Sequence, residues 1–145
     1  MILETDIYHI SEGSFEDKDL LGKGEKGLLL IARSSDLDNG GKEKLAAIIK
    51  AIKMDIDQDC FLYIFNDEKE SKAIAPYLRK HQIQDLILFG INPKEIGFTI
   101  QAKLYTTFQF ENLSLIISHK IQEMNANRSY KLALWNCLQQ QFLNT

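Results

Sequence analysis

The chain has 145 residues, 45% of them hydrophobic and 26% charged, and its formal net charge is −3. This size and composition are typical of one globular domain, and the acidic balance argues against a role that depends mainly on binding nucleic-acid phosphates. No apolar run approaches the roughly 18 residues that span a bilayer, and the first residues lack the basic segment of a secretory signal. We therefore expect a cytoplasmic protein without a membrane segment, whose direct binding of nucleic acid is weak or absent.

The chain begins with residues 1–26, which mix charges and glycines with isolated apolar side chains. This pattern indicates a weakly structured N-terminal segment, followed by a single α/β domain at residues 27–145. The continuous apolar run at residues 27–32, GLLLIA, is typical of a strand that is buried on both faces. A turn-rich stretch comes next, and the apolar spacing of residues 42–53 predicts an amphipathic helix.

Two further buried strands are expected at residues 60–65 and 86–90, because both are short apolar runs. Between them, roughly residues 70–81 favour a helix in which Pro76 marks either the first turn or a kink. After the third strand, Asn-Pro turns the chain, and residues 94–98 favour a short helical turn.

The last third of the chain predicts one more central strand and a closing helix. Residues 103–110 alternate loosely and fit either an edge strand or an extended loop, and residues 113–118 read as the fourth central strand. A helix is expected over roughly residues 128–142, with Asn127 as its N-cap. Trp135 lies on the apolar face of this helix, and we expect it to be substantially buried against the sheet.

Apolar strands that alternate with amphipathic helices predict a three-layer α/β/α domain with a mostly parallel four-stranded central sheet. The two cysteines, Cys60 and Cys137, fall in a predicted strand and a predicted helix. We expect both to be reduced residues of the core.

Two local motifs imitate ligand sites. Residues 22–27 match G-x-G-x-x-G, but they precede the first strand, so a flexible lead-in is expected rather than a nucleotide site. Asp55, Asp57 and Asp59 start like a calcium loop, but the glycine and glutamate that such a loop needs are missing, which favours a solvated turn. The three histidines are scattered, so we expect neither a metal site nor a cofactor.

Gly90-Ile91-Asn92-Pro93 resembles the string that opens the catalytic loop of mismatch-specific uracil-DNA glycosylases. In those enzymes the string follows the first strand, whereas here it follows the third, where a structural turn is expected. The first-strand loop, residues 32–38, lacks such a motif, although Asp36 or Asp38 could in principle act as a base. His119 follows the fourth strand, as the catalytic histidine of these glycosylases does, but without the proline and serine of their motif.

The order of elements resembles the uracil-DNA glycosylase-like fold and, more closely, the psi subunit of bacterial DNA polymerase III, a non-catalytic member of that fold. In this chain, as in psi subunits, a loosely structured segment precedes the first strand, which is expected here at residues 27–32. The chain also ends as psi subunits do, with Ala133-Leu134-Trp135 and Leu138 after a capping region at residues 125–128, and an aromatic, Phe142, at the end. The resemblance implies a non-enzymatic interaction protein of DNA replication, which bridges the clamp loader and the chi subunit.

In psi subunits the N-terminal segment binds the clamp loader. The resemblance therefore implies that Ile7, Tyr8, Ile10 and Phe15 contact a partner, with Tyr8 and Phe15 as anchors because aromatic side chains supply the most contact area. Alternatively, this segment packs along its own domain as an edge strand.

The alternative function is a divergent uracil-DNA glycosylase-like base-excision hydrolase. Asp36 or Asp38 would orient water, and His119 would stabilise the departing base. This hypothesis requires the three side chains to converge on one pocket.

Overall fold

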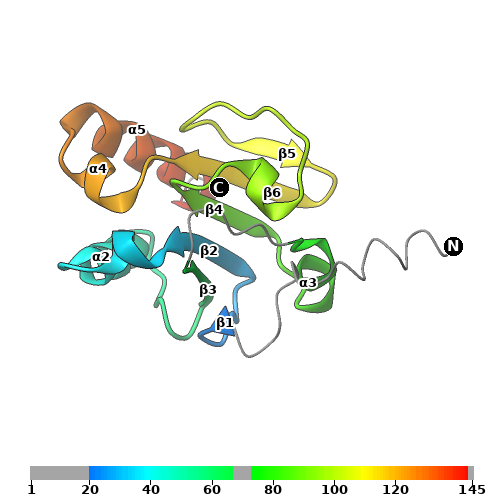
Figure 1. Ribbon diagram of the computed structural model, residues 1–145. Helices are drawn as coiled ribbons and strands as arrows, with labels where there is room; N and C mark the ends of the chain where they lie inside the picture. Colours follow the sequence, from blue (N-terminus) through cyan, green and yellow to red (C-terminus); the bar gives the residue numbers. More distant parts are fainter. Residues whose placement is uncertain (1–19, 67–72, 144–145) are drawn as a thin grey trace, which may run out of the picture.

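The computed structural model describes residues 20–66 and 73–143, which form a mixed α/β fold around one six-stranded sheet (Figure 1). The strands lie side by side in the order β1 (Leu20–Leu21), β3 (Cys60–Phe65), β2 (Leu28–Arg33), β4 (Asp85–Phe89), β6 (Leu113–Ser118) and β5 (Phe108–Phe110).

The four strands expected from apolar runs are all present and pair in parallel, but the predicted four-stranded sheet is wrong. Two short antiparallel edge strands widen it into a mixed sheet: β1 pairs Leu20 with Tyr63 of β3, and β5 pairs Phe110 with Leu113 of β6. Neither edge strand is a long apolar run, because an edge strand has only one paired side and needs less burial.

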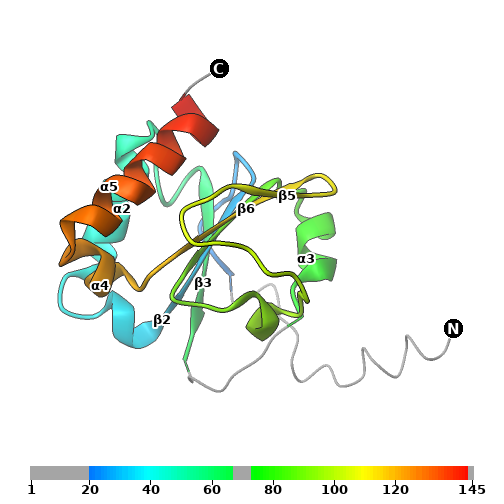
Figure 2. The same ribbon diagram turned by 90° about the horizontal axis from the view of Figure 1, so that it is seen from above.

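One face of the sheet is covered by α2 (Gly41–Ala51), α4 (Ile121–Asn125) and α5 (Arg128–Leu138), which lie on the same side in Figure 2. Asn127 caps α5 as predicted, because its side chain accepts hydrogen bonds from the N–H groups of Ser129 and Tyr130. The helical chain continues beyond α5 as a π-helical turn, η5 (Gln139–Leu143).

The opposite face is covered by α3 (Ala75–Lys80), by the 3-10 helix η4 (Pro93–Ile96) and by the loop after η4. Pro76 lies in the first turn of α3, where its missing N–H costs nothing, so the prediction of a first turn is confirmed. Leu28, Leu29, Leu30 and Ile31 of β2 are fully buried between the two helical faces. The sheet therefore has an apolar core on each side.

Residues 20–26 are more ordered than the sequence indicates. The N–H of Lys23 donates to the carbonyl of Asp57 at 2.9 Å, and the N–H of Glu25 donates to that of Gln58 at 3.0 Å. Gly24 has a φ of +61°, and a Cβ there would lie 2.1 Å from the ring of Phe61. The glycines thus form a tight loop against the start of β3, which corrects the prediction of a flexible lead-in.

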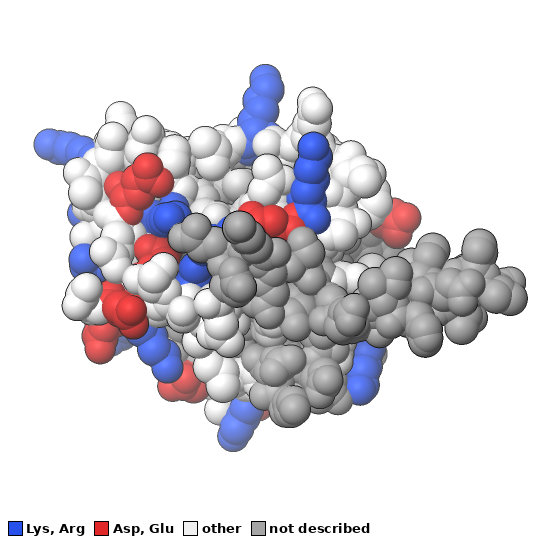
Figure 3. All heavy atoms as spheres, in the orientation of Figure 1, with Lys and Arg blue, Asp and Glu red and all other residues white. Residues whose placement is uncertain are grey.

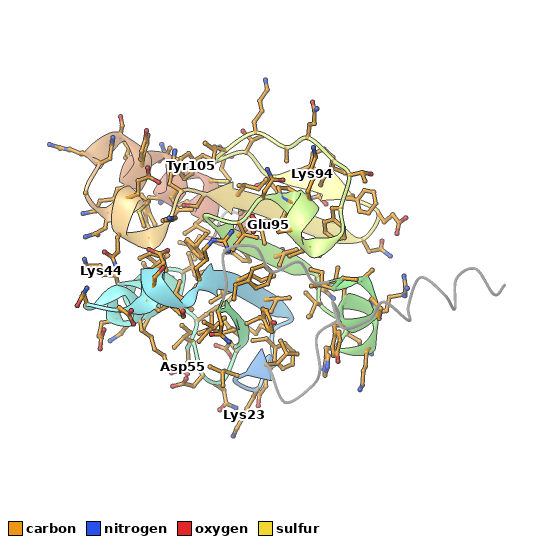
Figure 4. The ribbon with its side chains drawn as sticks, in the orientation of Figure 1. Lys23, Lys44, Asp55, Lys94, Glu95 and Tyr105 are labelled. Atoms are coloured by element: carbon orange, nitrogen blue, oxygen red, sulfur yellow. The ribbon has the colours of Figure 1, made fainter. Side chains whose placement is uncertain are left out.

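The turn at Asp55 lies beside this glycine loop (Figure 4). The carboxylate of Asp55 accepts hydrogen bonds from the N–H groups of Asp57 and Gln58, both at 2.9 Å. Asp59 in turn accepts from the N–H of Asp55 at 2.8 Å. These bonds satisfy the turn internally, as expected of a solvated turn.

Trp135 has its predicted role only in part, because it packs against the core on this face of the sheet but is less buried than its neighbours. The side chains of α5 that are buried against the sheet are Leu134, Cys137 and Leu138, whereas Trp135 is only partly buried. Residues 134, 137 and 138 share one helical face, and position 135 is rotated about 100° away from 134, toward α2.

Cys60 and Cys137 are free and buried, as predicted. Burial, reinforced by the negative charges of Asp59 and Asp55, raises the pKa of Cys60 to about 12, so its thiol stays protonated at neutral pH. Within residues 20–66 and 73–143, no helix combines the length and the apolar character needed to cross a bilayer.

Candidate functional site

The carboxyl ends of β2 and β4 meet at the point where the topology of the sheet reverses. After β2 the chain runs over one face through α2 to β3, and after β4 it runs over the other face through η4 and the following loop toward β5 and β6. Connections that leave two neighbouring strands in opposite directions open a crevice, and ligands of α/β proteins bind there. This edge is therefore the first place to look for a site.

An ion pair lies at this edge of the sheet. Arg33 ends β2, is 8% exposed, and pairs through its guanidinium with the carboxylate of Glu95 in η4 (Figure 4). The same guanidinium lies 5.9 Å from the centre of the Phe65 ring, at the end of β3. Charge-assisted hydrogen bonding and the aromatic contact together hold Arg33 in place.

Glu95 is held from its other side by a capping box. Its second carboxylate oxygen accepts from the N–H of Asn92 at 2.9 Å, and the side chain of Asn92 accepts from the N–H of Lys94 at 2.9 Å. Residues 90–93, which resemble a glycosylase motif, thus form the entry to η4. Their observed role is a structural turn that places Glu95 opposite Arg33.

Asp36 is buried, with 3% exposure, in the 3-10 helix η3 (Ser34–Leu37). Its carboxylate oxygens accept from the N–H of Ile121 at 2.6 Å and from the N–H of Gln122 at 3.0 Å. These N–H groups belong to the first turn of α4 and have no partner inside that helix. Asp36 therefore acts as a cap supplied by a distant loop, and both of its oxygens are occupied.

His119 lies in an aromatic cluster. Its ring stacks on that of Tyr130 in α5, with the centroids 3.8 Å apart and the planes 10° from parallel. Its Nδ1 lies 2.7 Å from the hydroxyl oxygen of Tyr105, which also accepts from the backbone N–H of His119 at 3.2 Å (Figure 4). Two tyrosines from separate elements fix the imidazole, and one of its nitrogens is already engaged.

The structure brings the loops of Asp36 and His119 together, but it does not build a catalytic pocket from them. Asp38 is exposed, and only its backbone carbonyl joins the contact, accepting from the Nε2 of Gln122 at 3.1 Å. The linings of three surface hollows in the described part of the chain contain none of Asp36, Asp38 and His119.

The four residues expected to contact a partner, Ile7, Tyr8, Ile10 and Phe15, lie outside the described residues, so their role stays a prediction.

Sequence reasoning missed the pairing of Arg33 with Glu95 and the clamp of Tyr105 and Tyr130 on His119. The first had a signal: an arginine at the end of a buried strand needs a partner, and Glu95 stands three residues after Asn92, the spacing of a capping box. The tyrosines gave no signal, because they are distant from His119 in sequence and belong to a loop and a helix.

On the face drawn in Figure 3, acidic and basic side chains are interspersed over the described surface and form no continuous basic stripe. A face that binds a nucleic-acid backbone is expected to gather lysine and arginine. Among the described residues, no group of three or more His, Cys, Asp or Glu side chains is placed to hold a metal ion.

No known family model matches the chain, and a search of the curated proteins gave no match either.

Proposed function

We propose that this chain is a non-catalytic interaction protein with a three-layer, uracil-DNA glycosylase-like fold. Like the psi subunit of DNA polymerase III, which it resembles, it would bridge a clamp loader and a chi-like accessory subunit. The observation that carries the non-catalytic part is the state of Asp36. Asp36 is 3% exposed, and each of its carboxylate oxygens accepts a backbone N–H bond from α4, which supports a structural role for Asp36 rather than the positioning of an attacking water.

The ion pair at the edge of the sheet supports the same proposal. At the ends of β2 and β4, where an α/β enzyme would hold its ligand, Arg33 and Glu95 pair with each other. The resemblance of the chain end to psi subunits, centred on Ala133-Leu134-Trp135, supports the choice of partner. The same helix α5 carries this motif and presents Trp135 at a partly open surface.

The proposal predicts that the purified protein releases no uracil from DNA. Wild-type protein, Asp36→Asn and His119→Ala should all match the buffer blank on single-stranded and mismatched substrates. Release by the wild type that disappears in Asp36→Asn or His119→Ala would instead establish the base-excision hydrolase.

Capture of the tagged full chain from its native host, read by mass spectrometry, tests the binding part of the proposal. Clamp-loader subunits or a chi-like protein should be enriched over a capture with an unrelated protein of similar charge. Enrichment of repair proteins without any replication protein would contradict the proposal.

A further inference from the structure

A groove lies between α2 and α5 on the solvent side of the helical layer, and we call it the α2–α5 groove. Its walls are apolar, and its volume is about 350 Å³. Both helices lie on the same side of the sheet (Figure 2), and α4 packs against each of them and closes one end. The side chains that shape it are Ala47, Ile48 and Ala51 of α2 and Leu134, Trp135 and Leu138 of α5.

A second hollow, of about 570 Å³, adjoins the groove around Trp135. The two hollows share Asn125, Lys131 and Trp135, so the indole stands between them. Leu132, which lines the second hollow, is 57% exposed. The partly exposed tryptophan and the exposed leucine form an apolar spot on this surface, and tryptophan is enriched among the residues that anchor interfaces.

The charged residues that line the two hollows have one sign. Lys44 and Lys131 line the groove, and Arg128 joins Lys131 at the second hollow, while neither lining contains an aspartate or a glutamate. Lys44 stands on the outer side of α2 (Figure 4). The lining of these hollows is therefore positively charged, although the net charge of the whole chain is −3. Apolar walls with a cationic rim are complementary to an apolar ligand with an anionic rim.

We propose that the α2–α5 groove binds an acidic amphipathic helix of a protein partner, whose apolar side chains contact Trp135 and whose carboxylates meet Lys44, Arg128 and Lys131. This inference deepens the proposed interaction role and rests on it. The stretch from Lys44 to Ala51 is about 10 Å long at 1.5 Å per residue. A partner helix of two or three turns therefore matches the groove, and a groove between two helices is a common seat for a third.

The test uses the full chain and a designed probe: a fluorescein-labelled peptide of about three helical turns with leucines at helical spacing and glutamates elsewhere. Its matched control carries lysine in place of every glutamate. Fluorescence anisotropy measures binding, and the emission of Trp135 reports on the groove itself, because the chain has one tryptophan. We expect the acidic peptide to bind about tenfold or more tightly than the basic one and to shift the tryptophan emission to shorter wavelength.

Paired charge reversals locate the binding. The double variant Lys44→Glu with Lys131→Glu should bind the acidic peptide about tenfold or more weakly than the wild type. Lys42→Glu with Lys50→Glu changes the net charge equally, at exposed positions of α2 outside the groove lining, and should leave the affinity within about twofold. Equal losses of affinity in both double variants, or equal affinities for the acidic and basic peptides, would show that the α2–α5 groove is not the binding site.

Two other occupants give distinct results, and either would overturn the proposal. Residues 1–19 of this chain are themselves acidic and contain apolar side chains. If Glu4→Gln with Asp6→Asn shifts the tryptophan emission and strengthens peptide binding, the occupant is the chain's own N-terminal segment. If sedimentation equilibrium shows a dimer that Lys44→Glu with Lys131→Glu abolishes, the occupant is a second copy.

The outcomes also separate this inference from the proposed function. If the chain binds replication proteins but not the acidic peptide, the proposed role of the α2–α5 groove is wrong and the proposed function stands. If the acidic peptide binds in the groove but the chain captures no replication protein, the groove proposal stands and the psi-like role is wrong.

Discussion

Asp36 and Asp38 stand two positions apart after β2, yet their side chains have opposite surroundings. Replacing Asp36 by Asn removes the negative charge that two N–H groups of α4 share, so we expect the free energy of unfolding to fall by about 1–3 kcal/mol. Asp38→Asn is the matched control: its side chain is exposed, and the change should stay within about 0.5 kcal/mol. Urea unfolding of the two variants measures the difference. Equal stability of both variants would mean that Asp36 is not a cap.

Asp85 gives a pH-dependent prediction. Burial raises the pKa of this carboxyl above its ordinary value of 3.8, although the hydrogen bond from Gln141 Nε2, at 3.0 Å, partly opposes the rise. A raised folded-state pKa means that ionising Asp85 costs stability; that cost is full above the folded-state pKa and disappears below the unfolded-state pKa. Asp85→Asn should therefore unfold at a higher temperature than wild type at pH 7.

The advantage of Asp85→Asn should shrink as the pH falls through the folded-state pKa and become constant below about 3.8, where the folded and unfolded carboxyls are both protonated. Melting temperatures of both proteins from pH 7 to pH 3 provide the check. An advantage that grows on acidification would show that the sign is wrong and that the carboxylate stabilises the fold.

At the scale of elements, α5 divides its apolar side chains between two tasks. Leu138 is 1% exposed and packs on the sheet, so Leu138→Ala should cost about 2–5 kcal/mol of unfolding free energy. Trp135 is partly exposed in the α2–α5 groove, and Trp135→Ala should cost only about 1–2 kcal/mol. Denaturant midpoints of the two variants test this order. A larger loss for Trp135→Ala would restore the role in the core that the sequence indicates.

The elements that could be predicted from sequence are those whose burial leaves a periodic trace. Residues 60–65 are a continuous apolar run, residues 113–118 are apolar except for two serines, and both are strands with the predicted bounds. The edge strand β1 leaves no such trace, because it spans two residues and pairs on one side. Residues 103–110 fit either an edge strand or a loop, and only Phe108–Phe110 form the strand β5. Trp135 is only partly buried, because helical spacing shows which residues share a face but not which neighbouring helix that face meets.

At the scale of the whole molecule, the candidate site shows where sequence reasoning stops. The loops of Asp36 and His119 lie at the same edge of the sheet, because each follows a strand of the parallel set. What each side chain does there depends on contacts between distant positions: Asp36 caps N–H groups 85 positions further along the chain. The ion pair of Arg33 and Glu95 joins residues 62 positions apart. Local patterns do not encode such pairs.

These contacts occupy the edge at which ligands of such α/β folds bind, which agrees with the proposed interaction role. The contacts that the psi-like proposal assigns to Tyr8 and Phe15 decide whether the binding is of that kind. Sedimentation velocity of the full chain mixed with the purified clamp-loader complex of its own cell tests this most directly.

We predict that the chain sediments with the clamp loader at micromolar concentration. Tyr8→Ala with Phe15→Ala should weaken the complex by about tenfold or more, because aromatic anchors supply most of the energy of such interfaces. Leu104→Ala, a change at a residue that is 44% exposed on the loop before β5, should leave the complex intact. A chain that sediments alone at all concentrations, or a complex that survives the loss of both aromatics, would contradict the account.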